Sequence, residues 1–382
     1  MTSSSPMVLS LLLLLSLTAL LLLAPRLSPP PPPGALHAAD EEQVPAASVT
    51  ATGGLGSGGV PSADEPDDLA LFRRATLEAA VTSSSSAAAA AAPPKVAFLF
   101  LTTTDLHFAP LWERFFAGHE SRRTVYVHAD PSSRLNRLLL TPSFRGRFVA
   151  AKPTRRADAS LIAAARRLLA AALLDDPANA YFALLSPSCV PLHSFPFLYS
   201  TLFPTPNPNP NPNPPHHKPT ISYIEVLKGE PQMASRYAAR GGEAAMLPEV
   251  PYARFRIGSQ FFALARRHAA LVVRESRLWR KFRAPCKPEA RDHECYPEEH
   301  YFPTLLDMAD PAGVARYTLT RVNWTGSVAG HPHTYAAAEV SPGLIRELRV
   351  SNNTHPYMFA RKFAPECLAP LMDIADSVIF KD

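Results

Sequence analysis

The sequence predicts an α/β fold in which a mostly parallel sheet is flanked by helices. Continuous apolar runs of strand length recur along residues 95–382, and segments with helical patterning separate them. The first run, residues 96–101, contains only Val, Ala, Phe and Leu, which is typical of a strand buried on both faces. Strands that alternate with helices in this way predict crossover connections and a parallel sheet.

The elements after the first strand follow from the same patterns. The Ala/Leu-rich run at residues 160–174 predicts a helix, with Arg166 and Arg167 expected on its outer face. The run from Tyr181 to Leu185 predicts another buried strand. The remaining segments predict helices over residues 110–116, 266–282 and 363–380, and strands over 124–128, 148–150, 222–227 and 257–264.

The N-terminus contains a Leu-rich run without a charged residue at positions 7–24. Its length is at the lower limit for a membrane-spanning helix, and a cleaved signal peptide is the alternative. The run is long for the apolar region of a signal peptide, and the Pro-rich segment after it is a poor cleavage site. We therefore expect residues 1–24 to hold a cytoplasmic tip and an uncleaved signal-anchor helix. Both interpretations direct the chain into the secretory pathway.

Two low-complexity regions are expected to lie outside the folded core. Residues 25–94 are rich in Pro, Gly, Ser and Ala, and predict a disordered luminal stem that holds a domain away from a membrane. The catalytic domain is then expected to span residues 95–382. Within it, the Pro/Asn-rich segment 204–219 predicts an exposed insertion, whose pair His216-His217 is weak evidence for a metal site.

The excess of basic residues lies in the predicted domain. The formal net charge of the chain is +5, yet residues 1–94 contain three Arg, no Lys and eight Asp or Glu. A basic domain favours anionic partners such as nucleotides, phosphates or acidic polysaccharides. The Arg residues are scattered along the chain, which disfavours a nucleic-acid-binding surface.

The four cysteines are an even number, as is common in secreted proteins. Cys286 and Cys295 are close in sequence and bracket a polar loop, which predicts a disulfide between them. A second disulfide between Cys189 and Cys367 then follows by elimination. Zinc binding is disfavoured because no pair has the Cys-x-x-Cys spacing.

The segment from Cys295 to Thr304 places the adjacent carboxylates Glu298 and Glu299 beside an imidazole, among aromatic residues. This mixture is typical of a concave site that holds a ligand and moves one proton. The alternative is the acidic first turn of a helix that begins at Pro297. Proline suits the first helical position, and carboxylates there complement the helix dipole.

Polar or turn-forming residues follow three of the predicted strands, at positions 102–107, 128–131 and 186–191. In open α/β sheets, ligands bind beyond the carboxyl ends of the strands, so we expect these segments to border a ligand site. Ser186 and Ser188 do not predict a hydrolase, because no Gly-x-Ser-x-Gly elbow frames them.

Several short motifs, taken in order, resemble those of a known enzyme family. They are Phe98–Thr102, Ala109–Phe116, Tyr126–Pro131, Gly258–Phe262, Cys295–Thr304, Val322–Trp324 and Phe359–Phe363. Together, from about Lys95 to Asp382, they resemble the plant branch of the core-2/I-branching N-acetylglucosaminyltransferase-like family. The resemblance implies a GT-A-like fold and an inverting transferase that uses a nucleotide-sugar donor. It also implies a single-pass type II Golgi membrane protein with a luminal catalytic domain.

The resemblance assigns roles to individual residues. Glu299 matches the general base of the family, and Lys362 matches the lysine that holds the donor diphosphate. Glu298 occupies the acidic position before the base and is a candidate for binding the acceptor. Trp324 resembles a tryptophan near the acceptor. The other candidates are Arg361 for the diphosphate, His128 and Asp130 for the nucleotide, and Gly258 and Ser259 for close approach of the backbone to the acceptor.

Two N-glycosylation sequons begin at Asn323 and Asn352. A glycan on Asn323 would crowd a site that includes the neighbouring Trp324. We therefore expect Asn352 to be the principal glycan carrier.

No Asp-x-Asp motif, a common divalent-metal ligand of nucleotide-sugar transferases, follows a predicted strand. Cationic side chains can neutralise the departing diphosphate instead. Arg361 and Lys362 are the candidates for this role, and a solvated pair beside the last helix is the alternative. We therefore expect metal-independent catalysis and no bound cofactor.

These observations predict a glycosyltransferase that moves N-acetylglucosamine, or another UDP-linked sugar such as glucuronic acid, onto a hydroxyl of a glycan or proteoglycan. Cell-wall acceptors are what a plant member suggests. A catalytically silent, glycan-binding or scaffolding protein on the same fold is the main alternative, and retention of Glu299 with Lys362 argues against it. A secreted hydrolase would need a second carboxylate about 5–10 Å away, and Glu298 is too close in sequence to supply it.

Overall fold

The computed structural model describes residues 68–84, 93–136, 140–204, 220–290, 295–327 and 330–382. These residues belong to one compact unit, residues 57–382. The predicted signal-anchor at residues 1–24 lies outside the described residues, as does the Pro/Asn-rich insertion beyond Pro204. Among the helices of the described residues, none combines the length and the hydrophobicity that a membrane-spanning segment needs.

The central sheet has the strand order β2-β1-β3-β5. Strands β1 (Lys95–Thr102), β2 (Arg123–Ala129) and β3 (Asn179–Leu185) are parallel, and the short β5 (Ala263–Ala265) pairs with β3 in the antiparallel direction. The prediction of a parallel α/β sheet is therefore confirmed for its three principal strands. The segment predicted as a third strand at residues 148–150 forms only an isolated parallel bridge between Phe148 and Val127.

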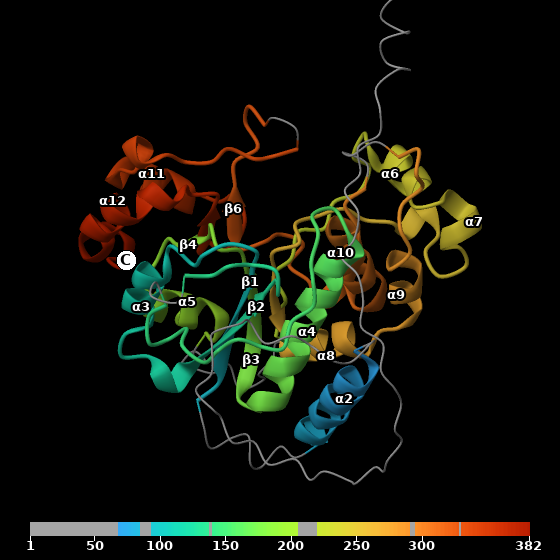
Figure 1. Ribbon diagram of the computed structural model, residues 1–382, viewed down its shortest axis with the longest axis horizontal. Helices are drawn as coiled ribbons and strands as arrows, with labels where there is room; N and C mark the ends of the chain where they lie inside the picture. The colour runs from blue at the N-terminus through green and yellow to red at the C-terminus, as the bar shows by residue number, and fades with distance from the viewer. Residues whose placement is uncertain (1–67, 85–92, 137–139, 205–219, 291–294, 328–329) are drawn as a thin grey trace, which may run out of the picture. The chain divides into compact units, whose positions relative to one another are not determined.

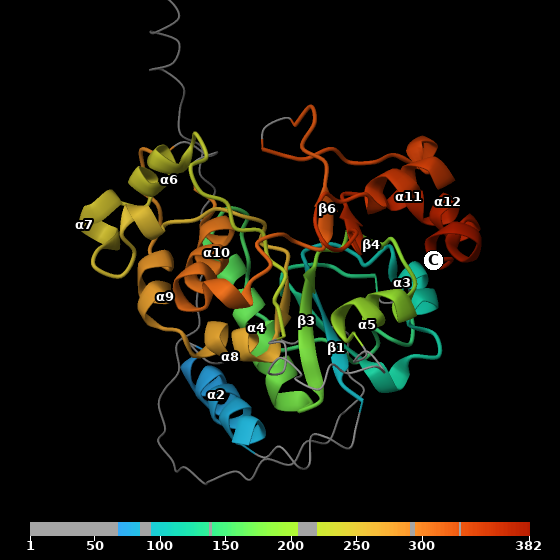
Figure 2. The ribbon, with the colours of Figure 1, turned by 180° about the vertical axis from the view of Figure 1, so that it is seen from behind.

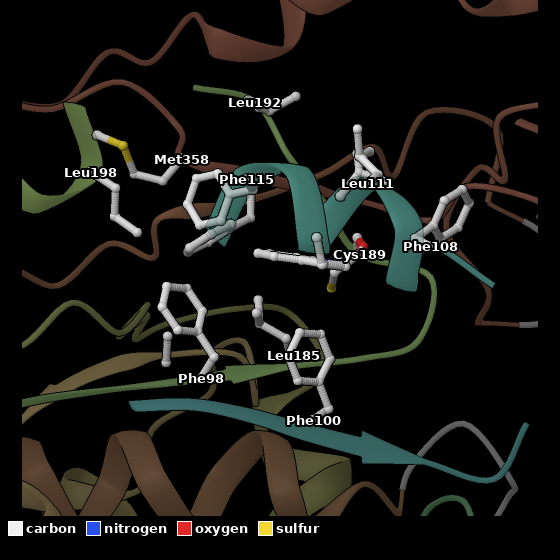
Figure 3. Close-up of a cluster of buried hydrophobic side chains, with 14 of the residues drawn as sticks. Phe98, Phe100, Phe108, Leu111, Phe115, Leu185, Cys189, Leu192, Leu198 and Met358 are labelled. Carbon is white, nitrogen blue, oxygen red and sulfur yellow. Dashed lines mark hydrogen bonds between the residues drawn. The ribbon is translucent and has the colours of Figure 1, made fainter. Parts of the chain in front are cut away.

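Strand β1 is buried on both faces, as its unbroken apolar sequence predicts. Val96, Phe98 and Phe100 belong to one hydrophobic cluster, whereas the alternate residues Ala97 and Leu99 belong to another. This division follows from the two-residue period of a strand. Figure 3 shows Phe98 and Phe100 below the helix that carries Leu111 and Phe115, which is α3 (Ala109–Phe116).

Helices cover both faces of the sheet (Figures 1 and 2). Helix α4 begins after Asp158, whose side chain accepts a hydrogen bond from the Ser160 amide and caps the helix. The helical elements are α2 (Leu69–Ser84), α3 (Ala109–Phe116), α4 (Ala159–Asp175), α5 (Phe195–Leu202), α6 (Met233–Ala239), α7 (Gly242–Met246), α8 (Arg266–Arg274), α9 (Arg277–Phe282), α10 (Pro297–Ala309), α11 (Pro342–Arg349) and α12 (Leu368–Asp373).

The prediction that Arg166 and Arg167 lie on the outer face of α4 is wrong. Both are buried, with 2% and 5% of their surface exposed. The guanidinium of Arg166 donates to the carbonyls of Val272, Val273 and Glu275 at the end of α8. These carbonyls have no partner within their helix, so a buried arginine satisfies them.

Part of the predicted stem is folded. Helix α2 lies within residues 25–94, and its residues Ala75 and Ala79 are buried. Figures 1 and 2 show α2 beside α4 and α8. Asp68, immediately before α2, forms ion pairs with Lys152 at 2.7 Å and with Arg167 at 2.6 Å. The stem prediction fails here because one apolar helical stripe finds a docking surface that composition does not reveal.

A second, three-stranded sheet has the order β4-β7-β6. It comprises β4 (Val190–Pro191), β7 (Phe359–Arg361) and β6 (Thr320–Val322). The strands predicted at 222–227 and 257–264 contribute only isolated bridges and the start of β5.

One predicted disulfide is present and the other is not. Cys286 and Cys295 are bonded, with their Cα atoms 6.2 Å apart. The prediction of a Cys189–Cys367 disulfide is wrong, because both are buried free thiols. The Cys189 sulfur accepts a hydrogen bond from the Ser186 amide, and the Cys367 thiol donates to the Tyr335 carbonyl. Each therefore packs as a small apolar residue with its own polar partner.

The docking of α2 can be tested by replacing Asp68 with Asn. We expect the free energy of unfolding to fall by about 3 kcal/mol, because the change leaves Arg167 buried without its carboxylate. Denaturant unfolding of the purified protein measures this loss. As a control, Asp376→Asn removes the exposed ion pair with Arg114, and should cost less than about 1 kcal/mol. Equal effects of the two substitutions would contradict the docking role of Asp68.

Candidate active site

Helix α10 positions the two adjacent carboxylates. Pro297 is its first residue, so Glu298 and Glu299 lie in the first turn, where carboxylates complement the helix dipole. Successive residues of a helix point in different directions. As a result Glu298 is buried, with 4% of its surface exposed, whereas the Glu299 side chain is 26% exposed. The helix interpretation of this segment is therefore confirmed, and it leaves one carboxylate open to a ligand.

The environment of Glu298 keeps its carboxyl group protonated. Burial raises its pKa to about 8, and the negative charges of Glu299 and Asp158 act in the same direction. Its Oε2 atom has no hydrogen-bond partner among the described residues. A neutral, buried acid is a weak base near neutral pH, so the pair offers Glu299 as its reactive carboxylate.

Glu299 is held by residues that are distant in sequence. Its Oε2 atom lies 2.7 Å from Nη1 of Arg236 on α6, and its carbonyl accepts a hydrogen bond from the Gly258 amide at 2.9 Å. The next residue, His300, contacts both Arg236 and the backbone of Arg256. Its Nδ1 lies 2.7 Å from the Arg256 carbonyl, its Nε2 lies 3.5 Å from Arg236, and burial lowers its pKa to about 3. The imidazole is therefore neutral, with Nδ1–H as donor and Nε2 as acceptor.

Gly258 brings a third carboxylate close to Glu299. A Cβ atom at position 258 would lie 1.9 Å from the Glu225 carbonyl oxygen, so only glycine permits this approach. Burial raises the pKa of Glu225, and the negative charge of Glu299 raises it further, whereas the Ser259 amide opposes the shift. The Ser259 hydroxyl accepts a bond from the Phe261 amide within the same turn. Gly258 and Ser259, which are predicted to border the acceptor, therefore lie beside Glu225.

The predicted cations lie at the end of β7. Burial lowers the pKa of Arg361, and the nearby carboxylate of Glu299 acts in the opposite direction. The Arg361 guanidinium stacks 4.3 Å above the centre of the Phe261 ring. Burial lowers the pKa of Lys362 to about 8, with further contributions from Arg361 and Arg156. Glu299 and the Arg361-Lys362 pair therefore border the same region.

His128 and Asp130 lie at the carboxyl end of β2, as predicted, but both are enclosed by protein. His128 is fully buried, and burial, with the positive charge of Arg167, lowers its pKa to about 4. Burial alone would raise the pKa of Asp130, but hydrogen bonds from Ser132 and Thr154 outweigh it and lower the value to about 2. The Asp130 carboxylate accepts four such bonds, from the amide and the hydroxyl of each residue.

Trp324 lies in the turn after β6 and is 53% exposed, which leaves its ring open to a ligand. The side-chain oxygen of the neighbouring Asn323 accepts a hydrogen bond from the Thr325 amide. Asn352 is exposed and borders a surface hollow of about 380 Å³ with Val350, Tyr357 and Arg321. Both glycosylation sites therefore stay predictions.

Sequence reasoning missed Arg156, Glu225, Arg236, Tyr296 and His331. Tyr296 lies within the Cys295–Thr304 segment but was given no role of its own, and no motif marks the others. In the part of the chain that the structure describes, no three or more His, Cys, Asp or Glu side chains gather as a potential metal site. This observation does not test the predicted metal independence.

The raised pKa of Glu298 predicts a pH-dependent effect of Glu298→Gln. A buried acid whose folded-state pKa is about 8 binds its proton more tightly than in the unfolded chain. The wild-type protein therefore loses stability as pH rises from about 5 to about 8, and the neutral Gln does not. We expect Glu298→Gln to gain stability relative to the wild type over this interval. Unfolding free energies of both proteins at the two pH values measure this gain, and a difference that is constant with pH would contradict it.

Comparison with known proteins identifies the family of this chain. Residues 96–349, about two thirds of the chain, match the family model described as Core-2/I-Branching enzyme. A protein of Oryza sativa subsp. japonica named Glycosyltransferase BC10 is 28% identical over 327 residues, which cover 74% of this chain and 76% of that relative. The family match includes Glu299 and ends before Lys362. The chain belongs to the core-2/I-branching enzyme family and is a glycosyltransferase.

Proposed function

We propose that this glycosyltransferase works by a single inverting displacement, with Glu299 as the general base. It transfers a sugar from a UDP-linked donor, N-acetylglucosamine or glucuronic acid, to a hydroxyl of a glycan or proteoglycan. The observation that carries the proposal is the position of the Glu299 carboxylate. It is partly exposed, paired with Arg236, and within electrostatic reach of the Arg361 that precedes Lys362.

The displacement follows from the chemistry of these groups. The acceptor oxygen forms a bond to the anomeric carbon while the bond from that carbon to the diphosphate oxygen breaks, and the acceptor proton passes to Glu299. A carboxylate in hydrogen-bond contact with the attacking hydroxyl contributes roughly 10²–10⁴-fold to the rate. Arg236 holds Oε2, so we assign Oε1 to the acceptor hydroxyl.

Glu225 and Trp324 are the proposed acceptor contacts. The Glu225 carboxylate lies near Glu299, and can accept a hydrogen bond from a second sugar hydroxyl. The exposed indole of Trp324 can pack against an apolar sugar face. Glu298, which the sequence analysis assigned to the acceptor, is buried and supports the helix instead.

The departing diphosphate is stabilised by cations in this proposal. Lys362 and Arg361 supply fixed positive charge where negative charge develops, which is the general role of such groups in transfer reactions. We propose that no divalent metal is needed. We also propose that the enzyme is a type II Golgi membrane protein, as the Leu-rich run at residues 7–24 suggests.

Replacing Glu299 with Gln tests the base. We expect the rate of UDP release from UDP-sugars with glycan acceptors to fall about 10²–10⁴-fold, with the KM for the donor little changed, because the amide cannot take the proton. Glu243→Gln, at an exposed carboxylate of α7, is the matched control and should retain activity. Thermal unfolding of each variant confirms that the fold is intact. If a folded Glu299→Gln protein keeps the wild-type rate, Glu299 is not the base.

The metal independence has its own test. We expect UDP release by the full-length protein to be unchanged when EDTA is added, because Lys362 and Arg361 provide the positive charge. Substituting Lys362 with Met should lower kcat by about tenfold or more, with or without EDTA. A rate that disappears in EDTA and returns with added Mg²⁺ or Mn²⁺ would show that a metal takes this role. A protein that binds glycans but releases no UDP from any UDP-sugar would instead be the silent alternative.

A further inference from the structure

Three basic side chains from separate parts of the chain meet around Lys362. Arg156, in the loop before α4, lies with its Nη1 2.6 Å from Nε2 of His331. Nδ1 of the same imidazole lies 3.3 Å from Nζ of Lys362. We call Arg156, His331 and Lys362 the basic cluster. Arg156 and His331 are exposed, so the cluster is open to a ligand.

The hydrogen bonds of the cluster leave one donor without an acceptor. An arginine side chain only donates, so the contact with Arg156 makes Nε2 of His331 the acceptor and places the proton on Nδ1. Nδ1–H then faces Nζ of Lys362, which in its charged form is also only a donor. Two donors 3.3 Å apart can both bond to one oxygen that lies at ordinary hydrogen-bond distance from each. An anionic oxygen therefore satisfies a contact that the protein alone leaves unfavourable.

The carboxyl groups near the cluster do not supply that oxygen. Asp158 pairs with Arg155 at 2.9 Å and caps α4. Glu298 is close enough to interact electrostatically with Arg156, but burial keeps it protonated. Within the described residues, Lys362 has no carboxylate at ion-pair distance. The positive charge of Lys362 is thus available to a ligand.

Tyr296 links the basic cluster to the proposed base. Its hydroxyl lies 3.4 Å from Nη2 of Arg156, whose guanidinium is 5.8 Å from the ring centre. The guanidinium of Arg236, the partner of Glu299, lies 5.3 Å from the same ring centre. Gly330 allows this approach, because a Cβ atom there would lie 2.9 Å from the Tyr296 hydroxyl. One aromatic ring therefore contacts both the cluster and the arginine that orients the base.

We propose that Arg156 and His331, together with Lys362, form a phosphate-binding cradle that receives the diphosphate of the donor. The inference rests on the proposed function for the identity of the ligand. Arg156 contributes a forked donor suited to phosphate oxygens, His331 contributes Nδ1–H, and Lys362 contributes a point charge. Arg156 and His331 are positioning residues, because they hold the leaving group and not the reacting carbon.

Binding measurements on the full-length protein test the cradle. Calorimetry gives the affinities of UDP, inorganic pyrophosphate and uridine for the wild type and for Arg156→Gln and His331→Ala. We expect both variants to bind UDP and pyrophosphate about tenfold or more weakly, and to bind uridine as the wild type does, because hydrogen bonds to charged phosphate oxygens are lost. Arg155→Gln is the matched control. The Arg155 side chain is next to Arg156 in sequence, is 82% exposed, and forms its ion pair within the described residues with Asp158. Arg156→Lys should recover part of the affinity.

Several outcomes would overturn the cradle. One is a wild type that does not bind pyrophosphate. Another is a folded Arg156→Gln variant with unchanged pyrophosphate affinity, or one that loses uridine as strongly as UDP. A loss of glucuronate binding without a loss of pyrophosphate binding would assign the cluster to an acidic sugar instead.

The UDP-release assay separates these results from failure of the proposed function. UDP release that continues while the Arg156 variant binds pyrophosphate normally refutes only the cradle. Pyrophosphate binding that depends on Arg156, without release from any UDP-sugar, refutes only the transfer reaction.

Discussion

The burial of β1 on both faces is the constraint on which the rest of the structure depends. Its alternate residues enter two different hydrophobic clusters, so helices must cover each side of the sheet. Parallel pairing with β2 and β3 then brings the carboxyl ends of all three strands to one edge. The loops that leave this edge carry Asp130 and Cys189, and Phe363, which follows Lys362, donates its amide hydrogen to the Ser188 carbonyl beside them. The candidate active site is thus placed by the core of the sheet.

Burial also gives two adjacent glutamates different environments. Glu298 and Glu299 are chemically identical, yet the first turn of α10 directs one into the protein and the other toward Arg236. Removing a carboxylate from water favours its neutral form, and an ion pair favours the charged form. The sequence Glu-Glu therefore produces one buried acid and one partly exposed carboxylate. The residue types alone reveal neither the difference in burial nor the difference in ion pairing.

The long elements could be predicted from the sequence because their patterns are local. The apolar run at residues 96–101 predicts β1, and the Ala/Leu-rich run at residues 160–174 predicts α4. Strands β5, β6 and β7 have three residues each and exist through tertiary pairing, which no local pattern records. Among the candidate site residues, Glu299 and Lys362 were predicted through the family resemblance, and Arg361 as the cation beside Lys362. Arg236 and Arg156 were not, because their partners Glu299 and His331 lie 63 and 175 positions away.

His128 and Asp130 were predicted to touch the nucleotide, but both are buried and contact the loop that carries Arg156. The Asp130 carboxylate accepts bonds from the amide and hydroxyl of Thr154, two residues before Arg156. The Lys152 amide lies 3.4 Å from Nε2 of His128, and its side chain pairs with Asp68 at the start of α2. The end of β2 and the start of α2 therefore both hold this loop. The position of the exposed Arg156 depends on this backbone as well as on its contacts with His331 and Tyr296. In the proposed cradle, His128 and Asp130 would therefore support the loop that carries Arg156, and the docked segment before β1 is part of the same support.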